Sequence, residues 1–110
     1  MKEVETKLIK VSITLTDKGF KQTIDVMNFD LEGANTYQRK IGGFFYKKNL
    51  GKITHICSEN HRIRYEFVCF DKDAANLSKQ VLRKIEAELM QMMQKLEDLS
   101  DAFMNKKLDL

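Results

Sequence analysis

The stretch that decides the fold is RIRYEFVCFDKDAANLSKQVLRKIEAELMQMMQKLEDLSDAFMN, residues 62–105. Its first part alternates apolar and polar residues, which is the period of a strand with one buried face. Asp73 then offers a good N-cap, and no proline or glycine follows it, so one helix can run from about Ala74 to about Asn105. This pattern predicts a closing strand that leads directly into a long helix.

An apolar seam runs along the predicted helix. Its members recur at alternating spacings of three and four, which is the a/d pattern of a coiled coil. They are Leu82, Ile85, Leu89, Met92, Leu96, Leu99 and Phe103. The helix should be about 45 Å long, whereas a strand of eight residues spans only about 26 Å, so the helix should outrun the sheet. We expect these seven residues to form a homodimer interface, with the helix orientation open. A seam buried on the chain's own sheet is the alternative.

The residues before this stretch predict the rest of an antiparallel sheet. Residues 8–15 alternate as a strand, and a turn follows at 17–19. A second strand runs to Leu31, with a phase change after Val26 that a β-bulge or a bend would explain. A third strand is expected at 37–41, and a hairpin turning around 58–60 should join residues 53–57 to the closing strand. The predicted fold is therefore α+β, with four to five antiparallel strands followed by one long C-terminal amphipathic helix. We expect a single domain over 1–110, with strands in 1–72 and the helix in 73–106.

Composition limits the class of protein. The chain has 110 residues, of which 43% are hydrophobic, enough for one core. No apolar run approaches the roughly 20 residues that cross a bilayer, and the amino terminus lacks an apolar signal region. Cys57 and Cys69 should lie too far apart along the hairpin for a disulfide. We therefore expect a cytoplasmic protein with no membrane partner.

Positive charge and aromatic rings gather in the middle of the chain. Between Arg39 and Arg64 there are seven basic residues and one acidic residue, although the net charge of the chain is only +3. Cations neutralise phosphates and exposed rings stack on unpaired bases, but a basic surface can equally meet an acidic protein. The candidate surface for a partner or a nucleic acid consists of Arg39, Lys40, Phe44, Tyr46, Lys47, Lys48, Lys52, Arg62 and Arg64.

Catalytic and metal-binding patterns are missing from the sequence. No nucleophile motif, phosphate-binding glycine loop or carboxylate pair is present. His55, Cys57, His61 and Cys69 are residue types that bind zinc, but Cys69 should lie far from the other three. We therefore expect no enzyme activity, no cofactor and no metal.

Two resemblances bear on function. Residues 64–70 followed by Asp73-Ala74-Ala75 resemble the central strand and next helix of RNA-recognition-motif domains. However, Glu66 replaces a small residue, the family's glycine is missing and no helix separates the first two strands. In general layout the chain resembles small phage and mobile-element proteins, including anti-CRISPR inhibitors. The residues that carry this likeness are Tyr37, Arg39, Ile41, Lys47-Lys48, Leu50-Gly51-Lys52-Ile53 and Asp73-Ala74-Ala75.

The second resemblance implies a non-enzymatic role, often as a dimer that occludes a surface of a larger protein, and it transfers no functional residue. The expected function is therefore a non-catalytic interaction or inhibitory module that acts as a homodimer on a macromolecular partner. The alternative is a protein that binds single-stranded DNA or RNA through the basic, aromatic surface.

Overall fold

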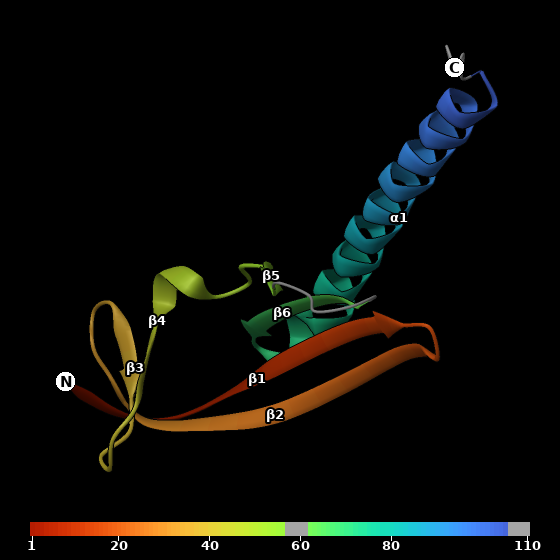
Figure 1. Cartoon of the computed structure of the whole chain (residues 1–110). Coiled ribbons are helices and arrows are strands. Elements are labelled where there is room, and N and C mark those ends of the chain that lie inside the picture. Colours follow the sequence, from red (N-terminus) through yellow and green to blue (C-terminus); the bar gives the residue numbers. More distant parts are fainter. Residues whose placement is uncertain (57–61, 106–110) are drawn as a thin grey trace.

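The computed structural model describes residues 1–56 and 62–105, which form one antiparallel sheet followed by one long helix (Figure 1). The elements are β1 (Lys2–Thr16), β2 (Gly19–Glu32), β3 (Thr36–Gln38), β4 (Phe44–Tyr46), β5 (Thr54–Ile56), β6 (Ile63–Cys69) and α1 (Ala74–Met104). Two 3-10 turns, Lys47–Asn49 and Asp71–Asp73, precede β5 and α1. The order across the sheet is β4-β3-β2-β1-β6-β5. The predicted α+β layout is confirmed.

The sheet is larger than predicted, with six strands among the described residues rather than four to five. The expected strand at 37–41 is only β3, which ends at Gln38. The chain then reverses at Gly42 and Gly43, whose φ angles of 62° and 93° suit glycine, and returns as β4. Phe45 then pairs with Tyr37. Ile41, expected within the strand, lies at the tip of this hairpin and is 94% exposed.

Of the two explanations offered for the phase change in the second strand, a bulge or a bend, the bulge was wrong. Residues 19–29 of β2 pair one-to-one with β1, and the register shift lies in β1, between Glu3 and Thr6. The phase change in β2 has another cause, since the two ends of this long strand carry apolar residues on opposite faces. Phe29 is buried on one face, whereas Ile24 and Val26 lie on the other and are more than half exposed.

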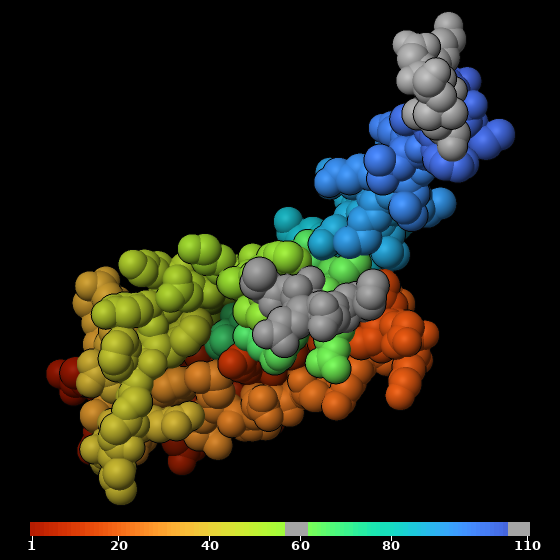
Figure 2. All heavy atoms as spheres, in the orientation of Figure 1, coloured from red at the N-terminus to blue at the C-terminus, as the bar shows by residue number. Residues whose placement is uncertain are grey.

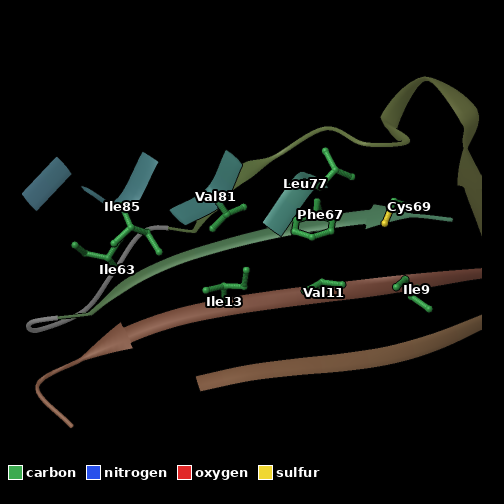
Figure 3. Packing of buried hydrophobic residues seen from close by; sticks show 9 residues of the cluster. All are labelled: Ile9, Val11, Ile13, Ile63, Phe67, Cys69, Leu77, Val81 and Ile85. Carbon is green, nitrogen blue, oxygen red and sulfur yellow. The ribbon is translucent and has the colours of Figure 1, made fainter. Parts of the chain in front are cut away.

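The main core lies between α1 and one face of the sheet (Figure 3). Leu77, Val81 and Ile85 of α1 are its helical members. They pack on strand residues Ile9, Val11, Ile13, Ile63, Phe67 and Cys69. Val81 and Ile85 are almost fully buried, and a side chain of this kind contributes roughly 1.5–3 kcal/mol on burial. This helix-side core therefore fixes the first part of α1 on β1 and β6.

A second core covers the opposite face at the other end of β1. Leu8, which precedes Ile9 and so points to the other face, is buried with Phe29 and Tyr37. Leu50 and Val68 pack against this cluster, and the N–H of Gly51 donates to the Val68 carbonyl at 2.8 Å. The connection from β4 to β5 is thereby held against β6, and Ile53 at its end packs on the helix-side core.

The start of α1 differs in detail from the expected capped helix. Asp73 makes no side-chain capping hydrogen bond, because it is the last residue of a 3-10 turn that continues into the helix. The helix ends at Met104, and Asn105 donates its N–H to the Asp101 carbonyl at 2.9 Å. The predicted turn at 58–60 and the last predicted helical residue, 106, lie outside the described residues. In the described part of the chain, no helix is both long and apolar enough to cross a membrane.

Candidate functional site

The far half of α1 stands clear of the sheet (Figure 2). Ile85 is the last buried residue of the described helix, and residues 86–104 extend about 28 Å beyond it. This part carries most of the predicted seam. The exposed fractions of its seam residues are 38% for Leu89, 46% for Met92, 65% for Leu96, 67% for Leu99 and 63% for Phe103. The structure therefore presents an apolar stripe, in heptad spacing, on the outside of the chain.

Ile85 does not belong to this exposed stripe. It is 1% exposed and packs in the helix-side core of its own chain, so its assignment to a homodimer interface was wrong. Leu82, on the preceding turn, is 44% exposed. A coiled-coil seam repeats every 3.5 residues, and the buried face of an ordinary helix repeats every 3.6 residues. Over three turns these periods differ too little for the sequence to show whether a residue belongs to the core or to the seam. The exposed seam thus consists of six residues: Leu82, Leu89, Met92, Leu96, Leu99 and Phe103.

A second exposed apolar surface, on β2, was not found from the sequence. Ile24 and Val26 pair with Val11 and Ile9, so they lie on the face that carries the helix-side core. They are 55% and 53% exposed, because α1 packs over β1 and β6 and does not reach across β2. The phase change after Val26 is the sequence feature that could have indicated this surface. A bulge or a bend in the strand would explain the same feature.

The structure does not bring the nine predicted basic and aromatic residues together. Arg39 and Lys40 lie at the end of the sheet where Lys2 pairs with Glu32, whereas Arg64 pairs with Thr14. Twelve residues of β1 separate the two ends, which is a distance of about 40 Å. Lys52 lies between them, on a shallow cavity that Lys10 and Glu66 also line.

At the first end, the cations are already engaged within the chain. Arg39 lies over the Phe29 ring, 5.2 Å from its centroid, and its Nε donates to the Asn28 carbonyl at 3.1 Å. The Lys40 Nζ lies 3.1 Å from Glu3 Oε1, and this hydrogen-bonded ion pair raises the pKa of Lys40. These contacts offset the positive charge expected there.

Lys47 and Lys48 have different surroundings. The Lys47 Nζ lies 3.7 Å from Glu32 Oε2 and 5.0 Å from the centroid of the Tyr37 ring. Lys48 lies over Tyr46, which is 44% exposed and meets the 58% exposed Phe44 ring edge-on at 5.0 Å. Phe44, Tyr46 and Lys48 therefore form the exposed part of this end of the sheet.

The cysteine and histidine candidates offer no reactive centre where they are described. Cys69 is buried, and burial, together with Asp73 and Asp71, raises the pKa of its thiol. A raised thiol pKa lowers the fraction of the nucleophilic thiolate. Within residues 1–56 and 62–105, no three His, Cys, Asp or Glu side chains are placed to hold a metal ion. Cys57 and His61 lie outside the described residues.

Comparison with known proteins gives no further guide. No family model, no curated protein and no solved structure matches this chain. Function is therefore argued from its surfaces.

Proposed function

We propose that this chain is a non-catalytic interaction module that acts as a homodimer joined through the exposed seam of α1. The observation that carries the proposal is the position of Leu89, Met92, Leu96 and Leu99, which keep heptad spacing beyond the last residue that packs on the sheet. Heptad-spaced leucines and methionines on a projecting helix are the surface that another helix covers in a coiled coil.

The exposed apolar area favours a stable partner. Large apolar side chains expose about 200 Å² when free, so the partly exposed seam offers roughly 600 Å² per chain. That equals the largest apolar patch usually found on a monomer. Two such stripes facing each other would bury up to about 1,200 Å², which exceeds the roughly 1,000 Å² expected of a specific interface.

The chemistry of the seam favours a second copy as the occupant. A dimer with twofold symmetry uses the same patch on both subunits, and an apolar stripe with a seven-residue repeat is complementary to itself. Both parallel and antiparallel pairing bury the same residues. The uncovered Ile24 and Val26 of β2 add apolar surface on the helix side of the sheet.

A dimer of this kind would present two copies of the sheet to a macromolecular partner. Two linked copies bind a partner with two sites more tightly than one copy does, through raised effective concentration. The likeness in layout to small phage and mobile-element inhibitors supports an inhibitory role, in which the paired modules occlude a surface of a larger protein.

The alternative proposal, binding of single-stranded nucleic acid through residues 39–48, has less support. Three of the cations there, Arg39, Lys40 and Lys47, are held by ring or carboxylate partners of the same chain. The exposed rings of Phe44 and Tyr46 remain suited to stacking.

The test of the homodimer is a double substitution in the part of the seam farthest from the sheet. Leu96→Glu with Leu99→Glu should place like charges in the interface and convert a dimer into a folded monomer. The matched control is Met90→Glu, which also adds a carboxylate at an exposed apolar residue. Met90 is 63% exposed and lies 120° or more around the helix from Leu96 and Leu99.

Light scattering during gel filtration measures the mass of each protein, and far-UV circular dichroism checks that it remains folded. The natural chain and Met90→Glu should elute with twice the mass of one chain, and the double variant with the mass of one. A natural chain that stays monomeric at high concentration would overturn the proposal, as would a double variant that stays dimeric.

A further inference from the structure

A basic groove lies at the end of the sheet where the β1–β2 turn meets the start of β6. Its volume is about 410 Å³, and its cationic lining residues are Lys18, Lys21, Arg62 and Arg64. Threonine hydroxyls, including those of Thr14 and Thr23, also line it. None of the described lining residues carries a carboxylate. The groove thus combines positive charge with hydrogen-bond donors.

Strand pairing brings the cations of this groove together. Thr14 of β1 pairs with Lys21 of β2 on one side and with Arg64 of β6 on the other. Residues directly opposite share a face, so the three side chains form a row across the sheet, with Lys21 and Arg64 starting about 10 Å apart. Their adjacent neighbours on β1, such as Ile13, face α1, so this row lies on the face that the helix does not cover.

The charge of the groove is only partly offset. Arg64 forms an ion pair with Glu66, whose carboxylate also accepts a hydrogen bond from Ser12 at 3.0 Å and lies 3.6 Å from the Lys10 Nζ. In the part of the chain that the structure describes, no carboxylate pairs with Lys18, Lys21 or Arg62. Like charges on the same face of a sheet repel each other, and an anion bound between them would remove that cost.

The end of the groove is bordered by Phe20, which is 61% exposed. Phe20 pairs with Leu15 of β1, which packs on the helix-side core, so the Phe20 side chain lies on the other face of the sheet from Lys21 and Arg64. The turn beside it is held by Thr16, whose Oγ1 accepts a hydrogen bond from the Lys18 N–H at 3.2 Å. The groove itself therefore offers cations and hydroxyls, which are the groups that contact phosphates in nucleic acids.

We propose that this basic groove binds the phosphate backbone of a nucleic acid. Lysine, arginine and threonine hydroxyls donate hydrogen bonds to phosphate oxygens. Only Arg62 and Arg64 of this groove were among the residues predicted from the sequence. The inference does not rest on the proposed homodimer, since no seam residue lines the groove.

The test compares two triple variants of equal charge. Lys18→Gln, Lys21→Gln and Arg62→Gln remove three cations from the groove, and Arg64 is kept because of its contact with Glu66. Lys79→Gln, Arg83→Gln and Lys84→Gln remove three exposed cations from α1, which packs on the other face of the sheet. Both sets change the net charge by the same amount, so general attraction to a polyanion should weaken equally.

Fluorescence anisotropy measures binding to a labelled single-stranded oligonucleotide of mixed sequence at two salt concentrations. The groove variant should bind at least tenfold more weakly than the natural chain, and its salt slope should fall by about 0.7 for each phosphate that the groove no longer neutralises. The control variant should bind within about threefold of the natural chain.

Two results would overturn the proposal. These are no binding by the natural chain at low salt and an equal loss of affinity in the two triple variants. A poly-glutamate peptide that displaces the oligonucleotide at equal charge concentration would show instead that the groove takes an acidic peptide.

Discussion

At the scale of single residues, Glu88 joins α1 to two strands of the sheet. The Tyr65 hydroxyl donates a hydrogen bond to Glu88 Oε2 at 3.1 Å, and the His55 Nε2 lies 3.7 Å from Oε1 of the same carboxylate. The rings of His55 and Tyr65 are in contact, with centroids 4.8 Å apart. Burial, followed by the hydrogen bond to Glu88, raises the pKa of Tyr65. These contacts hold the helix at the point where it leaves the sheet.

Tyr65→Phe should reveal this link through the pH dependence of stability. The loss of the hydrogen bond should lower the free energy of unfolding by about 0.5–1.5 kcal/mol at neutral pH. Because folding raises the pKa of Tyr65, its contribution is present below the unfolded value of about 10 and is lost as the pH rises through the higher folded value. The difference between the natural chain and Tyr65→Phe should therefore shrink above pH 10.

Urea unfolding followed by circular dichroism at neutral and alkaline pH measures this difference. Tyr37→Phe serves as a comparison. Burial raises the pKa of Tyr37 as well, but Tyr37 lies at the other end of the sheet. A difference for Tyr65→Phe that stays constant from pH 8 to pH 11 would contradict the assigned role.

At the scale of elements, α1 is one continuous helix with two environments. Leu77, Val81 and Ile85 are buried against the sheet, whereas Leu96 and Leu99 are about two thirds exposed. The apolar period continues through both parts, so it does not reveal where the helix leaves its own sheet. That point depends on the lengths of β1 and β6, the strands on which the helix packs.

Ile85→Ala and Leu99→Ala should separate these two environments. Ile85→Ala removes a fully buried side chain and should lower the free energy of unfolding by about 2–5 kcal/mol. Leu99→Ala should change it by less than about 0.5 kcal/mol at protein concentrations low enough to keep the chain monomeric. Urea unfolding of both variants at low concentration measures the effect. Equal losses would contradict the division of α1 at Ile85.

At the scale of the whole molecule, the chain is elongated. It measures 75 × 24 × 20 Å, and its radius of gyration is 20.3 Å, whereas a compact domain of this length has about 13 Å. The long β1–β2 hairpin and the projecting half of α1 together give this shape (Figure 1). The seam lies on that half of α1, whereas the basic groove lies on the face of the sheet that the helix does not cover. Self-association and ligand binding can therefore occur on different parts of the same molecule.

Self-association through the seam should make thermal stability depend on concentration. A dimer that dissociates as it unfolds is stabilised by mass action, so the Tm should rise by several degrees over a roughly hundredfold increase in concentration. Melting curves from far-UV circular dichroism measure the shift in the natural chain and in the variant with Leu96→Glu and Leu99→Glu. The double variant should melt at a constant temperature, and a constant Tm for the natural chain would contradict self-association.

The sequence by itself determined the features that depend on local patterns. The closing strand, the junction at 71–73 and the long helix followed from apolar periods of two and three to four, and from the lack of glycine and proline after Asp73. The seam was also identified from its spacing, except for Ile85. Such patterns involve residues within a few turns of each other, so they predict the same strand or helix in almost any tertiary structure.

Only the tertiary structure decided how distant residues were grouped. The long β1–β2 hairpin placed Arg39 and Arg64 at opposite ends of one strand pair, and it placed Lys21 beside Arg64 although 43 positions separate them in the chain. It also left Ile24 and Val26 uncovered, because one helix is too narrow to cover the whole face of the sheet. Strand register and helix position are set by packing over the whole chain, so charge clusters and exposed faces could not be derived from local spacing.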